Sequence, residues 1–232
     1  MVNRNLKYQQ KLVQRLFKTF LQGNMMKGYV WVLLLAMTSM ECVAGFDEGA
    51  AAYEAKDYTT AFREFLPLAN DGDAKSQAKL GLMYDNGEGV AQNYGKAVLW
   101  YRKAAAQDNA DAQYYLGLMY YKGNGVAQDY SQAAHFFRKA AEQGNPSAQF
   151  YLGLMYIKAD GVSKDYSQAA SLFRKAAEQG DNHSQHLLGL MYYNGEGVAQ
   201  DYSQAAHFFR KAAEQGNSSA QRSEEHTSEL QS

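Results

Sequence analysis

The sequence predicts an all-α fold, a solenoid of stacked helix pairs, and three observations lead to that prediction. The five-residue stretch LGLMY at 80–84 returns three more times, each copy 36 residues after the last. Glycine or aspartate marks the same period at 72, 108, 144, 180 and 216. Apolar residues within each period recur at helical spacing. A fixed period of roughly 20 to 50 residues is the signature of a solenoid or repeat array.

The first helix of each period, helix A, is predicted from a single apolar face. In residues 110–145 four apolar positions follow the spacing i, i+4, i+7, i+8 and therefore share one side of a helix. They are Ala112, Leu116, Met119 and Tyr120. Gly123 follows them, at a place where a residue with positive φ commonly ends a helix, and Asn124 to Val126 then turn the chain.

The second helix, helix B, begins at a capping signal. Asp129 precedes it as N-cap, and Gln132 stands three residues later as a capping-box partner. An apolar face follows, and Gly144 supplies the stop. The same signals return at Asp165, Gly180, Asp201 and Gly216. Two helices of this length cannot bury their apolar faces alone, so each pair must stack on its neighbours.

Glycine occurs in the middle of helix A, at Gly117, Gly153 and Gly189. Each such glycine costs roughly 0.8 to 1 kcal/mol relative to alanine, so its recurrence predicts a close packing contact. Two other signals deviate from the pattern. Asp108 replaces a stop glycine, and Ala159 replaces the glycine after the third helix A. We therefore expect less regular turns in the first and third repeats.

The repeat unit has a recognisable pattern, A-x-x-x-L-G-x-M-Y-x-x-G-x-G-V-x-x-D-Y-x-x-A followed by R-K-A-A-E-Q-G. It resembles the Sel-one-like repeat, a relative of the tetratricopeptide repeat. The copies are expected at 73–108, 109–144, 145–180 and 181–221, the last including the start of a truncated fifth. Residues 46–72 resemble a tetratricopeptide-like pair that caps the stack. The resemblance implies a right-handed α/α superhelix and a role as adaptor or scaffold for protein complexes.

Both ends of the chain look foreign to the repeats. Residues 25–45 are expected to be a signal peptide, because an apolar run of about a dozen residues is followed by Cys42-Val43-Ala44. We place cleavage after Ala44 or Gly45; a retained signal anchor is the alternative. Residues 1–24 are interpreted as upstream translated sequence or a basic extension. Residues 222–232 resemble a translated sequencing adapter, so we expect the native protein to continue with more repeats.

Composition narrows the classes of partner. Residues 46–221 carry 16 Lys and Arg against 20 Asp and Glu, a net charge of −4, and the basic residues are dispersed among the acids. Nucleic-acid binding is therefore not expected. The single cysteine, Cys42, lies in the predicted signal, so the mature repeats have no disulfide framework. No stable membrane insertion is expected after signal cleavage, because the apolar run is shorter than a bilayer span.

The candidate binding residues are helix A positions that vary while the scaffold recurs. One variable position precedes a constant leucine by four residues, the other follows it by three, and all three share a face. The candidates are Asp85, Tyr114, Leu118, Tyr121, Phe150, Leu154, Ile157, His186, Leu190 and Tyr193. They could form an aromatic groove for a peptide, or they could pack between repeats. The family resemblance places helix A on the concave side.

No enzyme motif emerges from the sequence. His183 and His186 are spaced i, i+3 and supply only two ligands, fewer than a metal site needs. Glycine pairs such as Gly123 and Gly125 connect helices and lack a phosphate-loop continuation. We therefore predict no catalytic residue, metal or cofactor.

The predicted function is an exported, periplasmic or secreted scaffold that binds a peptide or protein segment in the helix A groove. Two alternatives remain open. One is a secreted factor that acts on another cell. The other is a weak hydrolase or small-ligand-binding protein that uses the same groove.

Overall fold

The computed structural model describes residues 45–231, apart from the side chains of 226 and 228–231. Within this part of the chain the regular structure is α-helical. The predicted basic extension at 1–24 lies outside the described residues, as does the predicted signal peptide at 25–45 except for Gly45. No helix between 45 and 231 combines the length and apolar character needed to cross a membrane.

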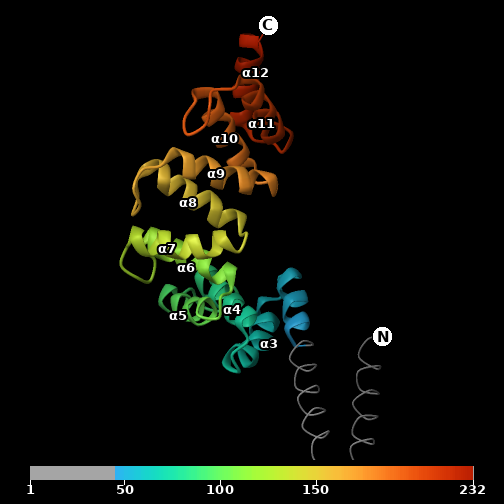
Figure 1. Cartoon of the computed structure of the whole chain (residues 1–232). Helices are drawn as coiled ribbons and strands as arrows, with labels where there is room; N and C mark the ends of the chain where they lie inside the picture. The colour runs from blue at the N-terminus through green and yellow to red at the C-terminus, as the bar shows by residue number, and fades with distance from the viewer. Residues whose placement is uncertain (1–44, 232) are drawn as a thin grey trace, which may run out of the picture. The chain divides into compact units, whose positions relative to one another are not determined.

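The described repeats supply helices A and B in alternation (Figure 1). The A helices are α4 (Ala74–Asn86), α6 (Ala110–Lys122), α8 (Pro146–Lys158) and α10 (Asn182–Asn194). The B helices are α5 (Tyr94–Ala105), α7 (Tyr130–Glu142), α9 (Tyr166–Glu178) and α11 (Tyr202–Glu214). A helical segment at 45–54 and α3 (Tyr58–Asn70) precede them, and α12 (Ser218–Gln231) follows. Each helix packs mainly on its neighbours in the chain, and α4 also contacts α6, which makes the fold an all-α solenoid.

Capping residues begin and end the helices at the positions that the sequence predicted. Asp129 precedes α7, and its carboxylate accepts a hydrogen bond from the backbone N–H of Gln132 at 3.0 Å. Gly123 ends α6 with φ 75°, and its N–H donates to the carbonyl of Met119 at 2.8 Å. Both groups satisfy backbone atoms that a helix end otherwise leaves without partners.

The expectation of less regular turns at Asp108 and Ala159 is wrong. Ala159 has φ 61°, and its N–H donates to the carbonyl of Met155 in the manner of the glycine C-caps. Asp108 has φ 57°, and its N–H donates to the carbonyl of Ala105 at 3.1 Å. The stacking of the helices imposes the same backbone path in every repeat. These two residues therefore adopt the left-handed conformation that glycine adopts elsewhere, although a side chain makes it costly.

The mid-helix glycines of helix A lie against aromatic rings of the following B helix. A Cβ added at Gly117 would lie 2.7 Å from the ring of Phe137, which is closer than real carbon contacts. The same relationship links five pairs: Gly49 with Phe65, Gly81 with Tyr101, Gly117 with Phe137, Gly153 with Phe173 and Gly189 with Phe209. The packing contact predicted from the glycine recurrence is confirmed.

A buried glutamine joins each repeat to the next. Gln113 in α6 donates through Nε2 to the carbonyl of Ala105 at 3.4 Å and accepts from Nε2 of Gln143 at 2.7 Å. The pairing within a repeat recurs between Gln77 and Gln107, Gln149 and Gln179, and Gln185 and Gln215. The bond to a carbonyl of the preceding helix pair recurs from Gln77 to Ala69, from Gln149 to Ala141 and from Gln185 to Ala177. Because buried amides are costly without partners, these bonds favour one alignment of neighbouring repeats.

The last helix, α12, follows α11 in the position that helix A takes in earlier repeats. Counted by the period, Glu224 stands where Leu188 lies, and Thr227 stands where Met191 lies. Thr227 is buried, and Glu224 forms an ion pair with Arg210 at 2.9 Å. The helix thus keeps the buried alanine of the repeat, at Ala220, but packs without its leucine and methionine. The non-native origin of 222–232 stays a prediction.

Candidate protein-binding face

The predicted site residues come from equivalent places on successive A helices. Tyr114 and Tyr121 lie on α6, Phe150 and Ile157 on α8, His186 and Tyr193 on α10, and Asp85 on α4. All seven are partly buried, as are Leu154 and Leu190, whereas Leu118 is buried. We call the surface made by these ten residues the helix A face. Apart from the buried Leu118, its side chains are neither wholly core nor wholly exposed, so they pack against neighbours and still reach solvent.

Tyr114 and Tyr121 are brought together by a residue of the next repeat. The ring of Tyr151, on α8, lies 6.0 Å from Tyr114 and 6.1 Å from Tyr121 between centroids. Tyr151 also stacks on Phe137 at 5.4 Å with an interplanar angle of 19°. These four rings, the aromatic cluster, span α6, α7 and α8. Tyr114 also lies 6.0 Å from Phe137, so each ring is held by at least two others.

The sequence reasoning missed Tyr151 and its equivalent Tyr115, although a signal was present. This position also varies between repeats, from Lys79 through the two tyrosines to Leu187. Tyr115 stacks on Tyr101 at 5.2 Å and 14°, which repeats the geometry of Tyr151 on its phenylalanine. The position directly after the first variable one therefore belongs to the same surface.

Burial acts on two tyrosine hydroxyls of this surface, those of Tyr114 and Tyr115. Burial, followed by the charge of Tyr151, raises the pKa of the Tyr114 phenol well above its ordinary value. Burial also raises the pKa of Tyr115. The hydroxyl of Tyr121 donates to Asp160 Oδ2 at 3.4 Å. The face thus combines apolar ring surface with hydroxyl groups that can donate or accept hydrogen bonds.

The C-terminal part of the face carries histidine among aromatic rings. Phe150 lies 6.1 Å from Phe173 and 5.9 Å from His183, and His186 lies 5.7 Å from Phe209. Burial, and then the neighbouring His183, lower the pKa of His186. In residues 45–231 no group of three or more His, Cys, Asp or Glu side chains is placed to hold a metal ion.

Asp85 marks the other end of the face. Burial raises its pKa, and the nearby positive charge of Lys122 partly opposes that change. The buried hydroxyl of Tyr101 lies close by, and its pKa is raised by burial and then by the charge of Asp85. Asp85 is therefore a half-buried acid beside a phenol and a lysine.

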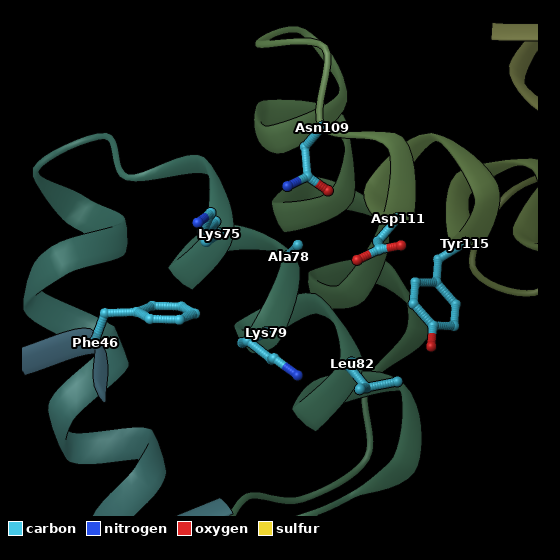
Figure 2. Close-up of a pocket in the computed structure, with 8 residues that line it drawn as sticks. All are labelled: Phe46, Lys75, Ala78, Lys79, Leu82, Asn109, Asp111 and Tyr115. Atoms are coloured by element: carbon cyan, nitrogen blue, oxygen red, sulfur yellow. The ribbon is translucent and has the colours of Figure 1, made fainter. Parts of the chain in front are cut away.

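A pocket of about 220 Å³ opens at the N-terminal end of the helix A face (Figure 2). Its wall on α4 is formed by Lys75, Ala78, Lys79 and Leu82, at the spacing i, i+3, i+4, i+7. The opposite wall comes from α6 and its N-cap, with Asn109, Asp111 and Tyr115, and Phe46 closes one side. Of these eight residues, the candidate set contained none.

Comparison with solved structures finds the same fold in other proteins. The crystal structure of c5321, described as a protective antigen of uropathogenic Escherichia coli with an SLR fold, matches with a TM-score of 0.74 and 40% identity. The match covers 82% of this chain and 41% of that one, so this chain spans less than half of that relative. A Sel1 repeat protein from Oxalobacter formigenes matches with a TM-score of 0.71, 36% identity and coverage of 76% and 72%.

A third structure, a Sel1 repeat protein from Klebsiella pneumoniae, shares the fold at 20% identity and a TM-score of 0.54. The match covers 81% of this chain and 93% of the Klebsiella chain. A search of curated protein sequences gave no significant match.

Stacked helix pairs with a partly exposed aromatic face define this chain as a solenoid repeat protein. The Sel1 repeat model matches residues 74–109, 110–145, 146–181 and 182–217. The chain belongs to the Sel1 repeat family, as its sequence pattern indicated. Proteins of this family generally act as protein-interaction scaffolds.

Proposed function

We propose that this chain is an exported scaffold that binds a peptide or protein segment on its helix A face. The observation that carries the proposal is the aromatic cluster. Its rings are wedged between consecutive repeats, yet Tyr114, Tyr121 and Tyr151 remain partly exposed. Side chains fixed in this way lose little entropy on binding, and tyrosine supplies both apolar area and a hydrogen-bonding group.

The face continues beyond the cluster onto the next repeats. Phe150 and Ile157 extend it along α8, and His186 and Tyr193 extend it along α10. An elongated surface of this kind suits an extended segment that contacts several repeats, each with a small part of the binding energy.

Export is supported by the apolar run before residue 45 and by the relative from Escherichia coli, which is described as a protective antigen. The test is the N-terminus of the chain isolated from periplasm and culture medium. We expect mass spectrometry to find a mature N-terminus at Gly45 or Phe46. Recovery of the uncleaved chain from the cytoplasm alone would remove the exported part of the proposal.

The binding surface is tested by photocrosslinking in an envelope fraction, with the crosslinker at Tyr193 of α10. The variant Phe150→Gln with Ile157→Gln removes apolar area from the face at two partly buried positions that border the core around Phe173, so its folding is checked as well. We expect crosslinks to one protein or peptide to fall at least about tenfold, the loss of roughly 1.4 kcal/mol of binding.

The matched control is Leu99→Gln on α5, because Leu99 is the most exposed large apolar side chain described, at 53%, and lies off the helix A face. It should leave the crosslinks unchanged, and thermal melts should show that all variants fold. Equal crosslinking by the face variant and the control would rule out the helix A face as the binding surface.

A further inference from the structure

The pocket at the N-terminal end of the helix A face exists because Ala78 is small. The equivalent position holds Tyr114, Phe150 and His186 in the later repeats, where rings occupy this space. Ala78 is 9% exposed and leaves a hollow that neighbouring side chains line without filling. The first repeat therefore offers a recess where the others offer an aromatic surface.

Two lysines line this hollow and have no counterparts elsewhere on the face. Lys75 and Lys79 stand one helical turn apart on α4, at positions held by Asp111 and Tyr115 in the next repeat. Their ammonium groups lie over the rings of Phe46 at 5.9 Å and Tyr53 at 5.1 Å. Neither lysine forms an ion pair within the described part of the chain.

A third donor comes from Asn109. Its Oδ1 accepts a hydrogen bond from the backbone N–H of Ala112 at 2.9 Å, which fixes the side chain as the N-cap of α6. Figure 2 shows its amide nitrogen turned toward Lys75. One repeat later, the amide of Asn145 donates to Asp111 at 3.2 Å. The residue that corresponds to Asp111 one repeat earlier is Lys75, whose ammonium group cannot accept a hydrogen bond. The Asn109 amide can therefore donate to a ligand.

Asp111 is the one acid in the pocket lining, and it is engaged by Asn145 on the far side. The pocket thus has two ammonium groups and an amide around the hollow and one hydrogen-bonded carboxylate opposite. At the other end of α4 stands Asp85, a half-buried acid. The two lysines of α4 therefore lie at the Ala78 hollow and its acidic residue lies at the opposite end of the helix.

We propose that the Ala78 hollow is the anchor for a carboxylate of the bound segment, held by Lys75, Lys79 and the Asn109 amide. The proposal rests on the helix A face as the peptide-binding surface and names the chemistry of one end of the partner. Charged hydrogen bonds of this kind are about twice as strong as neutral ones, so they fix the direction in which the segment lies. Aromatic or apolar side chains of the segment then follow toward Tyr115 and Tyr114.

The test is a fluorescence-anisotropy titration of the purified chain with a labelled peptide of sequence Gly-Tyr-Phe-Glu-Glu carrying a free C-terminus. Three further peptides separate the sources of the carboxylate. The first has an amidated C-terminus, the second has Gln-Gln in place of Glu-Glu with the C-terminus free, and the third carries both changes. We expect at least one acidic form to bind about tenfold or more tighter than the peptide that is both amidated and Gln-substituted, with weakening at high salt.

Two variants locate the effect. Lys75→Gln with Lys79→Gln should remove the preference for the acidic peptide. Ala78→Tyr fills the hollow with the residue that the next repeat carries. It should also remove the preference for the acidic peptide, while preserving the fold. The control, Lys139→Gln with Lys175→Gln, removes two exposed lysines from the B helices and should leave the preference unchanged.

The outcomes separate this anchor from the proposed function. Equal affinity for acidic and neutral peptides, absence of binding, or acid preference that survives the lysine and Ala78 variants would overturn the anchor. Binding lost in Phe150→Gln with Ile157→Gln but insensitive to the lysines overturns the anchor and leaves the face intact. Binding that depends on the lysines but not on Phe150 supports the anchor and removes the wider face.

Discussion

Gly117 of α6 lies directly against the ring of Phe137 on α7, with no room for one further carbon between them. Gly117→Ala should therefore destabilise the chain by about 1 to 3 kcal/mol, although alanine is the better helix former. Gly95→Ala is the matched control, because Gly95 lies in α5 with only Asn93 Oδ1 nearby, at 3.4 Å. It should be neutral or stabilising by up to about 1 kcal/mol. Urea unfolding followed by circular dichroism measures both; equal effects would mean that the close contact does not limit packing.

Ala159 ends α8 in a conformation that favours glycine, with φ 61°. Ala159→Gly should raise stability by roughly 0.5 to 1 kcal/mol, because glycine removes the clash of Cβ with the backbone. The reverse change in the preceding repeat, Gly123→Ala at φ 75°, should lower stability. Thermal melts of both variants check the pair. A lower melting temperature for Ala159→Gly would show that the backbone of Ala159 is not strained.

Glu224 and Thr227 occupy places on α12 where the repeat has leucine and methionine. Glu224→Leu with Thr227→Met should raise the unfolding free energy by about 2 to 4 kcal/mol, from burial of two apolar side chains. Loss of the ion pair with Arg210 subtracts little, because Arg210 is largely exposed. The control Glu225→Leu, at an exposed position, should give no comparable gain. Hydrogen exchange of α12 provides the direct measurement, and unchanged protection would contradict its packing as a helix A.

His186 makes stability depend on pH. Its pKa in the folded chain is lowered by burial and by His183, so the unfolded chain takes up a proton first as pH falls. The groups around it are His183 on its own helix, Phe209 on α11, and Ser223 on α12, whose Oγ lies 3.5 Å from Nε2. Its contribution is complete above the ordinary histidine pKa of about 6.5 and is lost as pH falls through the lower folded value.

The variant His186→Phe places there the residue that Phe150 supplies one repeat earlier. Between about pH 7.5 and pH 5 the chain should lose more stability than this variant does. Chemical unfolding at a series of pH values measures the difference. Parallel pH profiles for the two proteins would show that His186 does not titrate differently on folding.

Much of the fold follows from local patterns. The caps at Asp129 and Gly123, the two amphipathic helices of each repeat and the need for close packing at Gly117 were all predictable. The turns at Asp108 and Ala159 were not, because propensity at one residue is weaker than the packing of the helices on either side. The site was predicted in part. Comparison of repeats found Tyr114 and Tyr121, but not Tyr151, which joins them from the next repeat.

The sequence by itself determined the repeat, its helix pairs and its family, because periodicity and capping are local properties that a linear chain displays directly. Only the tertiary structure decided which parts of the surface of the stack form an aromatic cluster and which form a pocket. It placed Tyr151 between two predicted tyrosines, and it turned Ala78 into a hollow beside Lys75 and Lys79. Both depend on contacts between residues about 36 positions apart, and such contacts arise only when one repeat packs on the next.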